Sequence, residues 1–461
     1  MNSRVLSPAW FPAYSWWVML ACVVSAGFFI NWLVASVVLV VMLAHAFRPF
    51  DFMVAFCLTV AGATFVRYDA GKLTHELSLL TGVILLMLMC YTISMRGRLV
   101  VFPGTRLGWA LLSYVLLSMA NFGRGILSGH SNKFLLLDVL PVFAVGTSFL
   151  VANGFDSKRD LRTVVAALAV LGYGSAAFGF WVFAVIHTHT AGIYFNATPA
   201  LVALLFVNLA LRAERLKTTA VWMGLSLPLF LHQFLSFRRS LWVGCMAGLL
   251  TTILVFAVGS RTRWRRAGLV FGSLLGIGVV GAVSLELIYG QTDILSQSVA
   301  RFGSIGSTEL TMETRANVAR LVEAATMIDL IQQSPLLGYG LGYGFILKNW
   351  MWGERPVQYW ADDNYLLIWL KQGAIGLALY LWILWAGLRL GVRQARGREG
   401  RWESSWFATL AAAMGFMALF SLTDWPFNQV NPTFLLALLF GGSMAMAREG
   451  RIRLQWSSSP T

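Results

Sequence analysis

Residues 359–385, YWADDNYLLIWLKQGAIGLALYLWILW, show the pattern on which the whole chain is built. They join the end of a long polar interval, residues 289–363, to an apolar run that can cross the hydrocarbon core of a bilayer as a helix. Similar apolar runs, separated by short loops, fill most of the remaining chain. The sequence therefore predicts an all-α, polytopic transmembrane helix bundle with one long loop.

Composition supports this class. Hydrophobic residues make up 58% of the 461 positions, charged residues only 12%, and the mean hydropathy is +0.69. These values are typical of a membrane protein and leave no room for a soluble domain of ordinary size. We interpret the N-terminal segment as a short tail that leads into the first span and is not cleaved.

The apolar runs predict about fourteen spans, which divide into residues 1–288, the loop 289–363, and residues 364–461 with a short cytoplasmic tail. The first two runs could form one tilted helix broken near Asn31 and the fifth is short, so twelve or thirteen spans is the alternative. The expected spans are 15–30, 32–47, 52–66, 77–95, 107–120, 134–152, 161–186, 196–211, 219–236, 240–259, 267–288, 364–388, 405–422 and 431–447.

The net charge is +15, and the positions of the basic residues along the chain indicate membrane topology. Most Lys and Arg residues fall in short loops between apolar runs, which excludes nucleic acid as the partner and places the N-terminus in the cytoplasm. The same assignment places the interval 289–363 on the non-cytoplasmic face. The cysteines lie inside apolar runs, too far apart in sequence for a metal pattern, so we expect neither a disulfide nor a metal site; they are Cys22, Cys57, Cys90 and Cys245.

Two adjacent arginines, Arg238 and Arg239, occupy a very short outward turn, where the topology rule disfavours cations. They could simply extend to the lipid head groups. We favour an anion clamp, because a guanidinium group matches phosphate oxygens and stays charged at any working pH. Arg315 lies near the start of an amphipathic helix predicted at 311–333, where exposed amides also favour an anion. We expect this helix to lie across the membrane domain as a lid, ending before Pro335.

The run SPLLGYGLGYGF, residues 334–345, has glycines at alternate positions but matches neither a Walker A motif nor a dinucleotide fingerprint. A close-packed turn is the simpler interpretation, and a substrate loop that includes Gly338, Tyr339 and Gly340 is the functional one. The aromatic residues nearby could stack on sugar rings, although they are also typical of an interfacial belt; they are Tyr339, Tyr343, Trp350, Trp352 and Trp360.

Asp362 and Asp363 form the most informative pair, since carboxylates at the mouth of a transmembrane helix usually face a cavity or a cation. One of them can cap the helix that begins near Tyr365. The other can act as a general base toward an acceptor hydroxyl or hold an arginine in place. We therefore predict Asp362 and Asp363 as catalytic candidates, with Asn364 and Tyr365 as neighbouring substrate contacts.

Three segments in this order resemble the O-antigen ligase and O-antigen polymerase superfamily of bacterial membrane glycosyltransferases. They are SFRRSLWVG at 236–244, METRANVARLVEAATMIDLIQQSPLLGYGLGYGF at 312–345 and DDNYLLIWLKQGAIGLALYL at 362–381. The resemblance covers about residues 219–390. It implies a multi-pass protein of the bacterial inner membrane that transfers a glycan from undecaprenyl pyrophosphate on the periplasmic side, with inversion and with no metal, cofactor or nucleotide sugar. It also implies that Arg238 or Arg239 and Arg315 bind the pyrophosphate.

One departure from the family pattern bears on the acceptor. The His-Asn pair of the ligases falls on Asp362 and Asp363, whereas Asp363 and Asn364 partly resemble a polymerase motif. We therefore expect a polymerase of O-antigen or exopolysaccharide repeat units, with a glycan or lipid-linked acceptor and, as a further partner, a chain-length regulator or export machinery. A ligase that moves the glycan to lipid A-core is the alternative. A lipid-linked glycan transporter would need internal repeats, which the sequence lacks, and a purely structural envelope protein would not need this cluster of charges.

Overall fold

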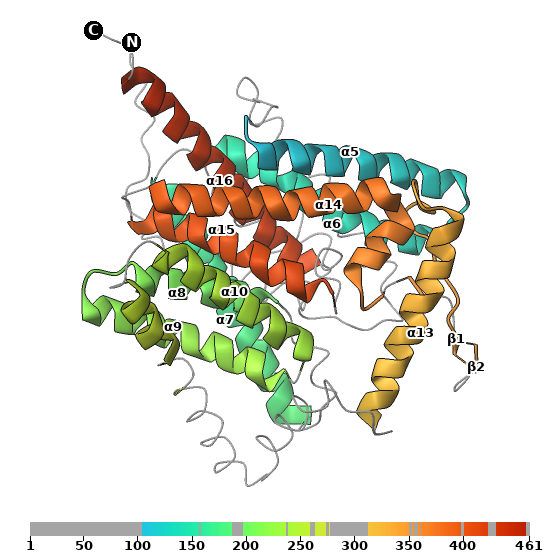
Figure 1. Ribbon diagram of the computed structural model, residues 1–461, viewed down its shortest axis with the longest axis horizontal. Helices are drawn as coiled ribbons and strands as arrows, with labels where there is room; N and C mark the ends of the chain where they lie inside the picture. The colour runs from blue at the N-terminus through green and yellow to red at the C-terminus, as the bar shows by residue number, and fades with distance from the viewer. Residues whose placement is uncertain are drawn as a thin grey trace, which may run out of the picture.

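The computed structural model describes residues 104–155, 158–186, 197–236, 238–258, 263–272, 276, 312–349, 353–354, 358–359, 361–397, 401–422 and 430–457. Helices account for most of these residues, which confirms the all-α class (Figure 1). They include α5 (Arg106–Leu127), α6 (Asn132–Gly154), α7 (Lys158–Ile186), α8 (Thr198–Leu211), α9 (Leu216–Leu235), α10 (Arg239–Ala257), α13 (Met312–Gln333), α14 (Asn364–Gly397), α15 (Arg401–Phe420) and α16 (Val430–Ser457). The expected spans at 15–30, 32–47, 52–66 and 77–95, and most of 267–288, lie outside the described residues.

Within the described part of the chain, six helices are long and apolar enough to cross a membrane. They are α5, α6, residues Asp160–Trp181 of α7, α10, α14, and residues Trp402–Phe420 of α15. Helix α8 and residues Thr433–Arg448 of α16 are shorter apolar helices. The protein is therefore a multi-pass membrane protein, as its hydropathy predicts.

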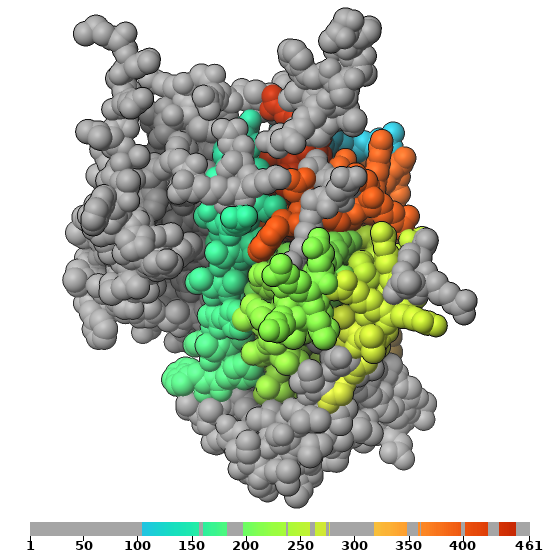
Figure 2. Space-filling view, turned by 90° about the vertical axis from the view of Figure 1, so that its left-hand side faces the viewer, coloured from blue at the N-terminus to red at the C-terminus, as the bar shows by residue number. Residues whose placement is uncertain are grey.

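The bundle is held together by close contacts between helices that are distant in sequence. Helix α6 packs on α16, and α15 packs between α10 and α14 (Figure 1). Small residues permit this approach: a side chain at Gly391 would overlap the backbone of Phe407, and one at Gly244 would overlap the ring of Phe416. On another face, α7 runs beside α8 and α9, and its residues form a continuous column in the space-filling view (Figure 2).

Helix α14 departs from the expected single span at 364–388. It consists of two helical segments that meet at Gly373, where φ is 70° and ψ is −175° (Figure 1). A side chain at Gly373 would overlap the backbone of Leu336, so glycine is required both for the positive φ and for the close approach of the chain. The sequence interpretation missed this break because it treated the apolar run as one helix.

The polar interval contains the predicted helix, α13, which ends at Gln333 before Pro335. Burial along this helix is uneven: Ile331 is buried, but Leu321 and Ile328 are 69% and 44% exposed. Met327 and Ile331 pack against Leu367 and Leu370 of α14. Helix α13 therefore rests on the first segment of α14 along only a narrow stripe.

The interval also contains a small hairpin that the sequence analysis did not predict. Strand β1 (Lys348–Asn349) pairs antiparallel with β2 (Gly353–Glu354), with Lys348 opposite Glu354. A bridge between Phe345 and Gln358, whose backbone groups exchange two hydrogen bonds of 2.7 Å, brings together the chain on either side of the hairpin. The chain therefore leaves the bundle near Phe345 and returns to it near Gln358.

Candidate active site

The acidic pair lies at the start of α14, and its two members have different contacts. Asp363 caps the helix: its Oδ1 accepts a hydrogen bond of 3.0 Å from the amide of Leu366, and its carbonyl accepts one of 3.0 Å from Leu367. Burial raises the pKa of Asp363 above its ordinary value of 3.8, although hydrogen bonds from the amides of Leu366 and Tyr365 act in the opposite direction. Asp363 is thus a capping carboxylate whose basicity is increased by its surroundings.

Asp362 connects this helix to α13. Its Oδ2 lies 2.6 Å from Nε of Arg320, and the two side chains are 43% and 42% exposed. The amide of Asp362 donates a hydrogen bond of 3.2 Å to Oε2 of Glu323, one turn further along α13. Sequence analysis allowed that one acid would hold an arginine, but it did not identify Arg320, because no local pattern connects residues 42 positions apart.

Asn364 and Tyr365 bind the start of α14 to the end of α15. The amide of Asn364 donates to the carbonyl of Ser421 at 2.9 Å, and the hydroxyl of Tyr365 donates to the carbonyl of Ala418 at 2.7 Å. The carboxamide of Asn364 is fully buried, and the hydroxyl of Tyr380 is its polar neighbour.

The glycine-rich segment 334–345 is packed among three helices. Positive φ values occur at Gly338, Gly340 and Gly342. Side chains there would meet, respectively, the backbone of α14 near Leu370, the backbone of α5 near Gly125, and Leu135 of α6. The alternate glycines therefore allow close packing, the simpler of the two interpretations.

This segment also satisfies the backbone groups that the break at Gly373 leaves without partners. The amides of Tyr339 and Gly340 donate to the carbonyls of Leu370 and Lys371 at 2.9 and 2.8 Å, and the amide of Ala374 donates to the carbonyl of Pro335 at 2.9 Å. A broken membrane helix is tolerated only where such groups are satisfied by other parts of the protein. These two loop amides are consequently engaged and not presented to a phosphate.

The arginines of the predicted clamp are only partly described. Arg238 precedes α10, and its amide donates to Oγ of Ser236 at 3.2 Å; the side chains of Arg238 and Arg239 are both half-buried. Arg315 lies in the first turn of α13, and its side chain is outside the described residues. Figure 1 shows α13 crossing the end of the bundle at which α10 and α14 begin. The joint role of the three arginines remains a prediction.

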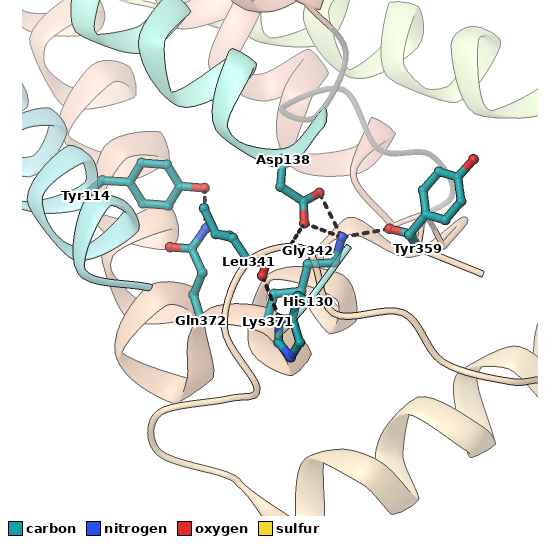
Figure 3. A network of polar contacts seen from close by, with 8 residues as sticks. All are labelled: Tyr114, His130, Asp138, Leu341, Gly342, Tyr359, Lys371 and Gln372. Carbon is teal, nitrogen blue, oxygen red and sulfur yellow. Dashed lines mark hydrogen bonds and ion pairs between the residues drawn. The ribbon is translucent and has the colours of Figure 1, made fainter. Parts of the chain in front are cut away.

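A buried ion pair lies next to this region and was missed by the sequence analysis (Figure 3). Nζ of Lys371 in α14 lies 2.7 Å from both carboxylate oxygens of Asp138 in α6. The side chains are 3% and 9% exposed. A charged residue inside each of two apolar runs was the available signal, because ionisable groups within membrane helices usually pair and mark functional regions.

A comparison with protein-family models connects these elements. Residues 224–381 match the family described as O-antigen ligase. This O-antigen ligase region includes α10, α13, the glycine-rich segment and the acidic pair, and it confirms the resemblance to the O-antigen ligase and polymerase superfamily. No curated protein matches the chain significantly. The O-antigen ligase region thus supports a role of the envelope-polysaccharide type in a membrane glycosyltransferase-like enzyme.

Proposed function

We propose that this protein polymerises O-antigen or exopolysaccharide repeat units carried on undecaprenyl pyrophosphate, at the periplasmic face of the bacterial inner membrane. The observation that carries the proposal is the acidic pair at the start of α14, within the O-antigen ligase region, where Asp363 is partly buried and its pKa is raised. A base with a raised pKa accepts a proton from an acceptor hydroxyl more readily than an ordinary carboxylate does.

In the proposed reaction, the acceptor hydroxyl attacks the anomeric carbon of the donor glycan. The oxygen–carbon bond forms, the bond between that carbon and the pyrophosphate oxygen breaks, and the hydroxyl proton passes to Asp363. The leaving lipid pyrophosphate carries away the electron pair and the negative charge. Arg238 or Arg239 and Arg315 would stabilise that charge, which is the role such groups have in other transfers with anionic leaving groups.

The partial burial of Asp363 and its position at the start of α14 support this role. Its Oδ1 already accepts the amide of Leu366, so the proton would be taken by the second carboxylate oxygen. Asp362 is held by Arg320 and is better suited to maintaining the position of α13. Between the two predicted catalytic acids, we therefore favour Asp363 as the base.

A second candidate function is supported by the family match, whose description is O-antigen ligase. A ligase would use the same donor but move the finished glycan to lipid A-core or another acceptor in a single transfer. Product analysis in proteoliposomes separates the candidates. A radiolabelled lipid-linked repeat unit should give a ladder of longer glycans with a polymerase, one adduct with a ligase supplied with its acceptor, and only a change of membrane side with a transporter. The transporter result would contradict the proposal.

A further inference from the structure

The Asp138–Lys371 pair makes more contacts than an ion pair needs. Besides both oxygens of Asp138, Nζ of Lys371 lies 2.7 Å from the carbonyl oxygen of Tyr359, to which it donates a hydrogen bond. Oδ2 of Asp138 also accepts a hydrogen bond of 2.7 Å from the amide of Gly342. The ammonium group has three donors, and three acceptors surround it. Figure 3 shows these groups converging between α6 and α14.

Stability of the bundle is a weak reason to keep this pair. Removing two charges from water costs free energy that their attraction only partly returns, and well-packed apolar residues often replace such a pair without loss. The helices α6 and α14 have large apolar surfaces with which to pack. The backbone groups that the pair binds, in contrast, have no apolar substitute.

Those two backbone groups lie at the two ends of the excursion, the segment 342–359 that contains the hairpin β1–β2. Gly342 precedes the hairpin β1–β2, and Tyr359 follows it. Tyr359 is held a second time, because its ring stacks on Phe134 of α6 with centroids 3.7 Å apart. Two residues later, Ala361 is fully buried against Leu367 and Leu370, and the acidic pair follows directly.

We propose that the Asp138–Lys371 pair is a positioning device for the acidic pair, an inference that rests on the proposed function. Asp138 fixes the chain where it leaves the bundle, and Lys371 fixes it where it returns, three residues before Asp362. The path from Tyr359 to Asp363 is then determined at one end by Lys371 and at the other by the cap that Asp363 makes on α14. The positions of Asp362 and Asp363 therefore depend on how α6 and α14 are held together by this ion pair.

The variants that test this inference are Lys371→Met and the paired Asp138→Leu with Lys371→Met. The paired variant removes both charges, so it avoids the isolated buried carboxylate that could prevent Lys371→Met from folding. Gln372→Met is the matched control: Gln372 is the next residue and is also buried, but its carboxamide contacts Ser118 and Tyr114 of α5 rather than the excursion. Melting temperature, hydrogen exchange of residues 342–363, and kcat and KM for transfer are measured on each.

The paired variant should melt near the wild type, exchange faster across residues 342–363, and lose about 10-fold or more in kcat, since small misplacement of reacting groups is costly. Its donor KM should change little, and Gln372→Met should retain both exchange and kcat. A paired variant that folds and keeps wild-type exchange, or that transfers at the wild-type rate, overturns the inference. If the wild type itself transfers no glycan, the proposed function fails, while the exchange measurement still decides whether the pair positions this segment.

Discussion

Arg320 of α13 and Asp362 at the start of α14 form an ion pair of 2.6 Å that connects the polar helix to the candidate active site. Both side chains are close to half exposed, so solvent screens the pair and its contribution to the free energy of unfolding should be below about 1 kcal/mol. Its expected role is local, because it holds α13 against α14.

The first prediction concerns this pair. Arg320→Gln should leave the melting temperature almost unchanged but increase hydrogen exchange in residues 318–333, because α13 loses one of its links to α14. Asp329→Asn is a suitable control, since it removes a charge from the same helix at an exposed position. Equal exchange in wild type and Arg320→Gln would show that the ion pair does not hold α13.

Substitution of Asp363 separates its two roles. Asparagine is about as good an N-cap as aspartate, so Asp363→Asn should fold normally, whereas Asp363→Ala should lose about 1 kcal/mol of stability with the cap. If Asp363 is the base, the Asn variant should still bind the lipid-linked donor and yet lose transfer, because a carboxamide accepts no proton at neutral pH. Normal turnover by Asp363→Asn would leave Asp363 with the capping role alone.

The pH dependence should show the raised pKa of Asp363. If Asp363 is the base, transfer requires its carboxylate, so the rate should fall on the acid side at a pH above the ordinary value of 3.8. Stability should follow the opposite trend: the contribution of Asp363 is greatest when it is protonated and is lost as the pH rises through its folded-state pKa. Single-turnover rates as a function of pH test this, with Asp362→Asn as the control that should retain the acid limb.

Gly373 should be the least replaceable glycine of α14. Alanine there must adopt a positive φ, at a cost of about 1–2 kcal/mol, and its side chain would also overlap the backbone of Leu336. We expect Gly373→Ala to lower the melting temperature and to disturb the glycine-rich segment. Gly224→Ala in α9, where nothing lies within 4 Å of the added carbon, should be tolerated. Equal melting temperatures for the two variants would contradict this account of the break.

Hydropathy and residue type were sufficient to predict much of the fold. The run 134–152 appears as α6, and the helix expected at 311–333 appears as α13, because span length and the position of Pro335 are local properties. The capping role of one acid was likewise predictable from its place before an apolar run.

The remaining features depend on contacts between distant segments. The break at Gly373 is possible because the glycine-rich segment supplies hydrogen-bond partners for the backbone groups that the break leaves free. Nothing in the sequence of either segment indicates that the two are in contact. The Asp138–Lys371 pair was overlooked because each residue is a single charge in a long apolar run. A hydropathy average over such a run hardly changes when it includes one charged residue. Arg320 contacts Asp362 only because α13 packs on α14.

The proposed arginine clamp would bind the pyrophosphate of the donor. Replacing Arg238, Arg239 or Arg315 by Ala should reduce transfer strongly at normal protein levels, and Lys should restore it poorly because an ammonium group lacks the planar fork that binds phosphate oxygens. Near-normal transfer by all three alanine variants would assign these arginines to topology or to lipid head groups.

The most direct test of the proposed function is to follow both products in proteoliposomes that contain purified protein and a radiolabelled undecaprenyl-pyrophosphate-linked repeat unit. The account predicts that wild type lengthens the glycan and releases one lipid pyrophosphate for each bond formed, and that Asp363→Asn does neither while still binding the donor. Wild-type protein that binds the donor but leaves the glycan on its lipid, with a suitable acceptor present, would contradict it.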